Sequence, residues 1–502
     1  MSSRAPTEPP SLGLDAPEAT RTTLVALAAL GVAFDLTFNG QTPGLAVGLF
    51  ALILAASFRT IAQRSLSTDL LLAGSVLFAI FPAVRAAGAL AALDILAAAA
   101  LLGLAATQDV ERMSTATVLG LLRRGLALAR RSLHVPGYLA SPLASPAERG
   151  RARRALRVAL ISTPILILFA ALLASGDRVF AKMLQSFLPE WDAANILSHV
   201  VLTLVGMALI AILWRSALGD REQPPARQPL TGLPELRASE WATVLGGINV
   251  LFGAFVVVQI RYLFGGSHRV EVTRGLTHAE YARSGFFQLA AAAALTIVVI
   301  LAAWDAGRRD DRRHETLFRA LVTGMVALTG VVLASALTRL ALYEGTFGFT
   351  INRFFGYVAI ASIGAVLVFL AAAIWTGRRD RVVVGFLVIG LAALLAVNIL
   401  NPDRFVADRN VARFEAIGKI DASYMGYSLG DDAVPVATTL LGKLSREDNQ
   451  ILRRALCERL DLLGHEPSWR SVNVGRAAAR RALETAGITH ATCANPAFAQ
   501  TR

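Results

Sequence analysis

The stretch FGYVAIASIGAVLVFLAAAIW-TGRRDR-VVVGFLVIGLAALLAVNIL, residues 355–400, decides the fold of this chain. It contains two apolar runs, Phe355–Trp375 and Val382–Leu400, each close to the roughly 20 residues that a helix needs to cross a bilayer. The turn between them carries Arg378, Arg379 and Arg381. Because a backbone in lipid has to satisfy its own hydrogen bonds, both runs are predicted to be transmembrane helices joined by a short polar turn.

Apolar runs of this kind recur from Thr22 to Leu400, and we predict eleven spans in all. They are Thr22–Phe38, Pro43–Phe58, Leu70–Val84, Leu90–Ala106, Ala155–Ala174, Ile196–Trp214, Trp241–Phe264, Gly285–Trp304, Leu317–Leu337, Phe355–Trp375 and Val382–Leu400. The run Leu70–Val84 is short and contains Pro82, so we expect it to be tilted, broken or re-entrant.

The composition agrees with a membrane protein. The chain of 502 residues is 55% hydrophobic and 17% charged, with a mean hydropathy of +0.54, whereas soluble domains are about 25% charged. The net charge of +13 comes from arginines clustered between the apolar runs, where membrane insertion places them, so we expect no nucleic-acid partner. The predicted fold class is an all-α polytopic membrane bundle of about eleven helices, with a small helical C-terminal extramembrane domain.

The domain organisation follows from where the apolar runs begin and end. We predict a disordered tail (1–21), a four-helix membrane segment (22–106), a basic amphipathic helix with a linker (107–154), a seven-helix membrane bundle (155–400), a helical extramembrane domain (401–488) and a loose tail (489–502). The basic helix is expected to lie on the cytoplasmic leaflet, and a solvated connector is the alternative. Helical patterns in the extramembrane domain cover about Asp403–Ile417, Ala433–Leu463 and Ser468–Ala486.

The arginine distribution predicts the orientation. Loops on the same side as the N-terminus carry most of the arginines, including Arg308, Arg309, Arg378 and Arg379, while the opposite loops are poorer. The N-terminus is therefore predicted to be cytoplasmic, in the inner (cytoplasmic) membrane of a bacterium. Eleven crossings then place the C-terminal domain outside, where the compartment would allow Cys457 and Cys493 to form a disulfide.

Several motifs resemble those of a known family. They are Gln259 with Arg261-Tyr262-Leu263-Phe264-Gly265-Gly266, then GLTHAEYAR from Gly275 to Arg283, Gly285-Phe286-Phe287, Ser335-Ala336-Leu337, Arg339, Tyr343, Gly348, Thr350 and Arg353, followed by Asn401-Pro402-Asp403, Asn410, Arg413, Asp421, Tyr424 and Asp432-Ala433-Val434-Pro435. In this order they are similar to the uncharacterised bacterial family of polytopic membrane proteins catalogued as domain of unknown function 4173, close to number 4153. The resemblance covers about Ala155 to Ala486. It implies a polytopic inner-membrane protein and leaves the activity open.

The predicted topology brings polar residues of separate segments to one outer face. We predict a polar vestibule there, capped by the C-terminal domain, because charges near membrane segments usually face a bundle interior or an aqueous cavity. The candidate ligand-binding residues are Asp177, Arg261, Glu280, Tyr281, Arg283, Arg339, Tyr343 and Arg353, with Asn410, Arg413, Asp421, Tyr424 and Asp432 as candidate inter-domain contacts. The arginines offer forked donors for phosphate or carboxylate. We favour a structural ion pair of Arg339 or Arg353 with Glu280, Asp177 or Asp421, which would dock the C-terminal domain onto the bundle, over the binding of an anionic ligand, and catalysis comes third.

Other polar residues give weaker signals. Asp35 and Asp94 lie in or near predicted spans, as members of a proton relay or as hydrated acids. The seven histidines form no HExxH pattern and the chain has no phosphate-binding P-loop motif, so we predict no metal, no cofactor and no catalytic residues.

The sequence leaves three classes of function open. We rank a membrane-integral binding or assembly protein first, with membrane lipids and another membrane or signalling protein as partners. A transporter or lipid-handling protein comes second, although no inverted repeat is recognisable. A membrane enzyme acting on a lipid-linked substrate comes third, because the first outer loop, Asn39–Thr42, is too short to resemble the large acidic loop of polyprenyl-sugar transferases.

Overall fold

The computed structural model describes residues 20–40, 42–61, 65–107, 158, 162, 193–218, 235–264, 286–309, 311–464 and 468–494. Within these ranges the chain is helical apart from turns and one isolated bridge between Leu236 and Gly307. Nine of the described helices are long and apolar enough to cross a membrane, and α2 is a shorter apolar helix. The protein is therefore an all-α polytopic membrane protein with a helical extramembrane domain at its C-terminal side.

The described membrane helices match ten of the eleven predicted spans. They are α1 (Arg21–Phe38), α2 (Leu45–Ile61), α3 (Leu66–Val84), α4 (Gly88–Thr107), α9 (Ala193–Leu218), α10 (Ala238–Phe264), α12 (Phe286–Ala306), α13 (Arg312–Phe347), α14 (Ile351–Trp375) and α15 (Val382–Leu400). The predicted span Ala155–Ala174 and the predicted basic amphipathic helix lie outside the described residues.

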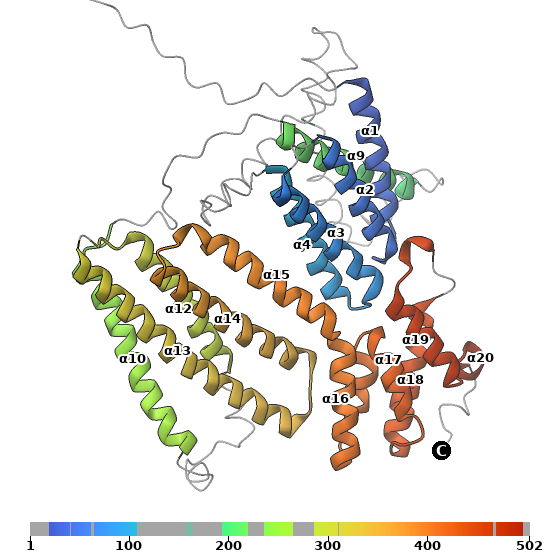
Figure 1. The fold of residues 1–502 in the computed structure, drawn as a ribbon. Helices are drawn as coiled ribbons and strands as arrows, with labels where there is room; N and C mark the ends of the chain where they lie inside the picture. Colours follow the sequence, from blue (N-terminus) through green and yellow to red (C-terminus); the bar gives the residue numbers. More distant parts are fainter. Residues whose placement is uncertain are drawn as a thin grey trace, which may run out of the picture.

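The membrane helices form two groups (Figure 1). Helices α1 to α4 pack with α9 around a core that includes Leu27, Phe58 and Trp214. Helices α10, α12, α13 and α14 pack around a second core that includes Trp241 and Phe318. Helix α15 runs between the groups and contributes to both, since Leu394 packs against the first core and Val382 belongs to the second.

Helix α13 is much longer than its apolar window predicts. Its 36 residues span about 54 Å, against about 30 Å for the hydrocarbon core of a bilayer. The Asp311 side chain accepts a hydrogen bond from the His314 amide and caps the amino-terminal end. The helix therefore continues beyond the predicted Leu317–Leu337 at both ends, and its last turns carry Arg339, Tyr343 and Glu344.

Helix α3 is continuous, and the expectation of a broken or re-entrant segment is wrong. Ser65 caps its first turn by accepting a hydrogen bond from the Thr68 amide. Pro82 lies in the last turn, where a proline removes few helical hydrogen bonds. The side chain of Asn473 donates to the carbonyls of Pro82 and Arg85, so the C-terminal domain satisfies this helix end.

The C-terminal domain consists of helices around a core that it shares with the ends of the membrane helices, which contribute Leu90, Phe354 and Val397. The helices of the domain are α16 (Pro402–Ile417), a π-helical turn (Tyr424–Ser428), α17 (Val434–Ala437), α18 (Arg446–Leu463), α19 (Val474–Thr485) and α20 (His490–Cys493). Asn401 separates α15 from α16 with a left-handed backbone (φ 54°), a conformation that asparagine tolerates better than most residues. The long pattern predicted over Ala433–Leu463 is interrupted, because Gly442 adopts a positive φ of 77°.

A disulfide between Cys457 and Cys493 joins α18 to α20, with the two Cα atoms 5.7 Å apart. The region predicted as a loose tail from residue 489 thus begins with a short helix. Its N-cap Thr489 forms a capping box with Thr492.

The C-terminal domain contacts one end of the membrane bundle, called here the vestibule end; the opposite end is called the far end. Arg470 donates to the carbonyl of Leu36 at the end of α1, and Asp432 accepts from the Ala86 amide before α4. Asn39, just after α1, bonds Ser198 in the second turn of α9, so α9 also begins at the vestibule end. Helix α4 starts at the vestibule end and leads away from it.

Candidate functional site

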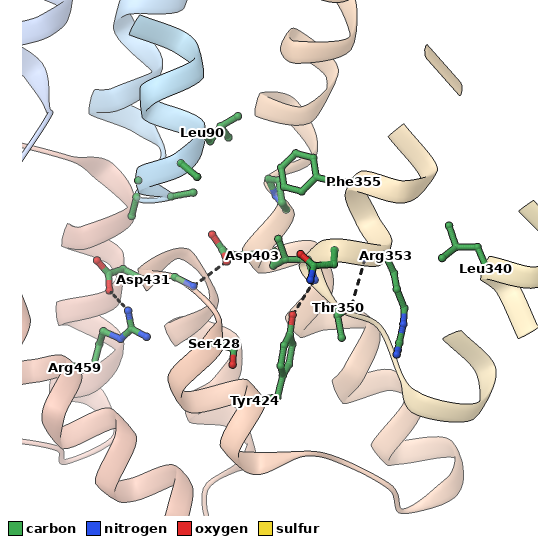
Figure 2. A pocket seen from close by; sticks show the side chains of 18 of the residues that line it. Leu90, Leu340, Thr350, Arg353, Phe355, Asp403, Tyr424, Ser428, Asp431 and Arg459 are labelled. Atoms are coloured by element: carbon green, nitrogen blue, oxygen red, sulfur yellow. Dashed lines mark hydrogen bonds and ion pairs between the residues drawn. The ribbon is translucent and has the colours of Figure 1, made fainter. Parts of the chain in front are cut away.

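A cavity of about 860 Å³ lies between the vestibule end and the C-terminal domain; we call it the vestibule (Figure 2). Its walls come from the α3–α4 turn, the end of α13, the beginnings of α14 and α16, and the C-terminal domain. The lining residues are Ala86, Ala87, Gly88, Ala89, Leu90, Leu340, Tyr343, Thr350, Ile351, Asn352, Arg353, Phe355, Pro402, Asp403, Tyr424, Ser428, Gly430, Asp431 and Arg459.

The α13–α14 turn forms the part of the vestibule that carries Arg353. Gly348 ends α13 with a positive φ of 83°, and a Cβ there would lie 2.9 Å from the Asn410 side-chain oxygen, so only glycine fits. Asn410 holds the turn from α16: its oxygen accepts from the Phe349 amide at 3.0 Å, and its nitrogen donates to the Phe349 carbonyl at 2.8 Å. The turn is therefore fixed by the C-terminal domain.

Arg353 is the third residue of α14 and is buried, with 8% of its surface exposed. Its guanidinium donates to the Gly348 carbonyl and lies 4.0 Å from the centre of the Tyr343 ring and 5.9 Å from that of Phe347. Its Nε–H has no hydrogen-bond acceptor among the described residues. The described partners of this buried cation are thus a carbonyl and two aromatic faces.

Acidic side chains lie on the other side of the vestibule (Figure 2). Asp403 is buried at the start of α16 and accepts from the Gly430 amide at 2.8 Å. Asp431 pairs with Arg459 at 3.2 Å, and the same guanidinium donates to the Leu429 carbonyl at 2.7 Å. Burial raises the pKa of Asp403 above its usual range, and the Gly430 hydrogen bond opposes this.

Asp432 joins the C-terminal domain to the α3–α4 turn beside the vestibule. Its carboxylate accepts from the Ala86 amide at 3.0 Å, and the residue is buried. Burial raises the pKa of Asp432, and the nearby carboxylate of Asp403 acts in the same direction. Arg476 adds a contact to the turn between α1 and α2, since it donates to the Pro43 carbonyl at 2.9 Å.

Tyr424 connects the C-terminal domain to the first residue of α14. Its hydroxyl oxygen accepts from the Ile351 amide at 2.8 Å, so the O–H remains able to donate to another group in the vestibule. Burial raises the pKa of this hydroxyl, which therefore remains a neutral donor at physiological pH.

The predicted ligand-binding residues are only partly described. Tyr343 and Arg353 line the vestibule. Arg339 lies on α13 next to Leu340, partly exposed and outside the lining. Arg261 lies in the last turn of α10; its side chain, together with Asp177, Glu280, Tyr281 and Arg283, falls outside the described part of the structure.

The predicted inter-domain residues occupy different positions. Asn410, Tyr424 and Asp432 make the contacts described above. Arg413 donates to the Thr346 carbonyl at the end of α13. Asp421 instead caps its own turn by accepting from the Tyr424 amide, so its contact is within the C-terminal domain.

Sequence reasoning did not select Asp403, Asp431 and Arg459 as site residues, nor the small-residue turn Ala86–Ala89. Asp403 belongs to the Asn401-Pro402-Asp403 motif that was used only for the family resemblance. The turn carries no charged or aromatic residue that would signal a site. The Ala86–Ala89 turn reaches the vestibule because α3, which packs against α4, also contacts α19 of the C-terminal domain.

Asp35 and Asp94, the two acids that the sequence analysis singled out, each have a hydrogen-bond partner. Asp35, at the end of α1, lies 2.6 Å from His199 Nδ1 and 3.0 Å from the Asn39 side-chain nitrogen. Asp94 is fully buried one turn below Leu90 and accepts from the Asn398 side chain at 2.7 Å. The two carboxylates belong to separate contacts, and the described residues contain no cluster of three metal-ligating side chains.

The fold and the vestibule define a class: a polytopic α-helical membrane protein whose extramembrane helical domain lines one side of a cavity at one end of the bundle. A family profile described as Domain of unknown function (DUF4153) matches residues 72–440. This is more than half of the chain, which therefore belongs to that family; the resemblance noted from the sequence motifs is confirmed. No curated protein and no solved structure matches the chain.

Proposed function

We propose that the protein is a membrane-integral binding protein whose C-terminal domain closes a polar vestibule at the outer surface of the bacterial cytoplasmic membrane. The observation that carries this proposal is the cavity of about 860 Å³ at the junction of the domain with the bundle. Ligand sites are typically concave, mostly apolar, and equipped with a few placed polar groups. Leu90, Leu340 and Phe355 supply the apolar part here, and Arg353, Tyr424 and Asp403 the polar part.

Two observations support the proposed orientation. The far end carries Arg308, Arg309, Arg378 and Arg379 between its helices, as cytoplasmic ends typically do. The C-terminal domain contains the Cys457–Cys493 disulfide, and disulfides persist in oxidising compartments outside the cytoplasm. Both favour a cytoplasmic far end and an external vestibule.

Binding is favoured over transport and catalysis by the way the vestibule is built. Its walls are fixed by hydrogen bonds between the domain and two helix–helix turns: Asn410 and Tyr424 hold the α13–α14 turn, and Asp432 holds the α3–α4 turn. The lining acids are engaged with an amide (Asp403) or an arginine (Asp431), and no described group is placed as a nucleophile with a base. A pre-formed site that holds a ligand is the simplest use of such an arrangement.

To test the proposal, a large side chain is placed in the vestibule, and the loss of a bound molecule is measured. Gly88 lines the cavity, and a Cβ on it would meet no atom within 4 Å, so Gly88→Phe extends into open space. Gly103, further along the same helix, is equally open and lies away from the vestibule, which makes Gly103→Phe a matched control. Each protein is purified in mild detergent, and co-purified small molecules are identified by native mass spectrometry.

We expect a molecule that co-purifies with the wild type and with Gly103→Phe and is lost from Gly88→Phe. Retention of the same molecule by Gly88→Phe, or a wild-type protein that carries none after extraction from native membranes, would contradict the proposal. A stoichiometric protein partner recovered in place of a small molecule would favour the assembly alternative.

A further inference from the structure

Among the described residues, no group around Arg353 carries the negative charge that would match it. A buried cation is strongly destabilising unless an anion or a full set of hydrogen bonds compensates for lost hydration. Arg353 lies at the amino-terminal end of α14, where the helix dipole is also positive, so the backbone of α14 adds to the unfavourable charge. The Gly348 carbonyl and the Tyr343 ring offset part of this, but neither carries a negative charge.

The described carboxylates around the vestibule have other partners. Glu344 accepts from the Tyr357 hydroxyl at 2.7 Å. Asp403 accepts from the Gly430 amide, and Asp431 pairs with Arg459. None of the described carboxylates forms an ion pair with Arg353, whose Nε–H lacks any acceptor. A negative charge supplied by a ligand would compensate both the charge of the guanidinium and the positive end of α14.

The position and shape of the vestibule restrict what that anion belongs to. The cavity lies where α4 and α14 begin and α15 ends, which is the membrane surface. Leu90 and Phe355 lie on the side of the membrane helices, and Tyr424 and Ser428 on the side of the C-terminal domain (Figure 2). A ligand with a charged head and an apolar body fits both sides. The planar fork of arginine is suited to phosphate oxygens.

We propose that Arg353, at the start of α14, binds the phosphate group of a membrane phospholipid, with its acyl chains directed toward Leu90 and Phe355. This inference rests on the proposed function, since it names the ligand class of the same vestibule. A free phosphate ester has the same head chemistry without the chains, and the test separates the two sources.

The protein is stripped of lipid in a neutral detergent and titrated with phosphatidylglycerol, with diacylglycerol, and with glycerol phosphate. Binding is measured by native mass spectrometry and by the shift in melting temperature. We expect phosphatidylglycerol to bind and to raise the melting temperature, diacylglycerol to do neither, and glycerol phosphate to compete only at far higher concentration. Glycerol phosphate that binds as tightly as the lipid would overturn the assignment to a lipid.

Three variants test the role of Arg353. Arg353→Met removes the charge at similar size and is expected to weaken phosphatidylglycerol binding at least about tenfold, as for loss of a charged hydrogen-bonding group. Arg353→Lys keeps the charge without the fork and is expected to lose less. Arg404→Met alters an exposed arginine at the start of α16 and is the matched control, with unchanged affinity.

Equal affinity of the wild type, Arg353→Met and Arg353→Lys for phosphatidylglycerol would overturn the inference. If Arg353→Met does not fold, the affinities of Arg353→Lys and the wild type for phosphatidylglycerol still test the inference, because a lysine cannot form the bidentate contact. A structural ion pair with Glu280 predicts a different pattern: Glu280→Gln and Arg353→Met lower the melting temperature equally and leave lipid binding unchanged. A bound molecule without phosphate that is lost from Gly88→Phe but insensitive to Arg353 would keep the proposed function and reject this inference.

Discussion

Arg309, which is partly buried at the far end of the bundle, and Arg353, which is buried at the vestibule end, differ in the charged groups around them. At the far end, the Arg309 side chain is 15% exposed and pairs with Glu315 at 3.2 Å. It also donates to the Ala303 and Trp304 carbonyls in the last turn of α12, the negative end of that helix. At the vestibule end, Arg353 lies at the positive end of α14 and has no described carboxylate partner.

The same contrast holds for acidic residues. Asp305 at the far end pairs with Arg379, whereas Asp403 and Asp432 at the vestibule end are buried and accept from backbone amides. Burial alone therefore does not distinguish the two ends, since both contain buried charged groups. What distinguishes the vestibule end is that three of its buried charged residues, Arg353, Asp403 and Asp432, form no ion pair among the described residues, although Asp431 and Arg459 pair beside them. We take this as the mark of a site that a ligand completes.

The largest effect is expected from the disulfide, which only the vestibule end has. Cys457 and Cys493 are 36 residues apart, and in the chain-entropy account such a loop stabilises the folded domain by about 3 to 4 kcal/mol. Replacing both with serine should release the C-terminal domain at a lower temperature than the bundle. Hydrogen exchange during thermal melting measures this: α18 and α19 should lose protection early, with α12 and α13 unchanged. Simultaneous loss in both regions, or no loss, would contradict the expectation.

The next largest effect is expected in the stability of protein stripped of lipid, where Arg309 and Arg353 are compared directly. Arg309→Met breaks an ion pair and leaves Glu315 without one of its partners. The free energy of unfolding should fall by about 2 kcal/mol, which is less than for a fully buried pair because Glu315 is partly exposed. Arg353→Met removes a buried charge that has no opposite charge among the described residues, and should leave the stability of the lipid-free protein unchanged or raise it, because that charge is destabilising without an anion. Denaturation in detergent measures both. The reverse order of the two effects would show that Arg353 has a structural partner.

A smaller effect concerns pH and the acids of the vestibule end. Burial raises the pKa of Asp432 and of Asp403 in the folded protein above the usual 3.8. As the pH rises from about 4 through the raised pKa, the folded state loses a proton that the unfolded state has already lost, so the free energy of unfolding falls. The C-terminal domain should thus melt higher at pH 5 than at pH 7.5.

Asp432→Asn keeps an oxygen for the Ala86 amide and removes the titration, so it should flatten this pH dependence. Asp408→Asn, on the exposed side of α16, is the control and should leave the slope as in the wild type. A wild-type domain that becomes more stable between pH 5 and pH 7.5 would contradict the sign of the effect.

The smallest effect is expected where the two ends do not differ. Arg59–Asp69 at the far end and Arg404–Asp408 at the vestibule end are both exposed ion pairs, at 3.4 and 3.8 Å. Exposed pairs contribute about 0 to 1 kcal/mol, so Arg59→Ala and Arg404→Ala should each change the stability by less than about 1 kcal/mol. A large loss at either end would indicate a buried role that the structure does not show.

The sequence predicts the membrane helices well because a bilayer imposes a length and a composition on them. The range Val382–Leu400 agrees with α15 at both ends. The sequence fails where a helix continues into water, because hydropathy reports the lipid contact and not the backbone. Helix α13 therefore runs ten residues past the predicted Leu337 to Phe347, and the extra turns carry Tyr343 to the vestibule.

The site was predictable only in part. Arg353 and Tyr343 stand out as polar residues close to a span, and Asn410 and Tyr424 as polar residues in motifs of the C-terminal domain. Their mutual positions depend on contacts between segments hundreds of residues apart, such as Asp432 with the Ala86 amide. No local pattern encodes such a contact. The spacing of Ala86 to Ala89 in particular gives no sign that these small residues line a cavity.

The most direct test is a cryo-electron microscopy map of the wild-type protein in discs of its native membrane. We expect density for a phosphate group within hydrogen-bond distance of the Arg353 guanidinium, continuing as acyl chains past Leu90 and Phe355. A side-chain carboxylate of the protein itself in that place, or a vestibule that holds only water, would contradict the account.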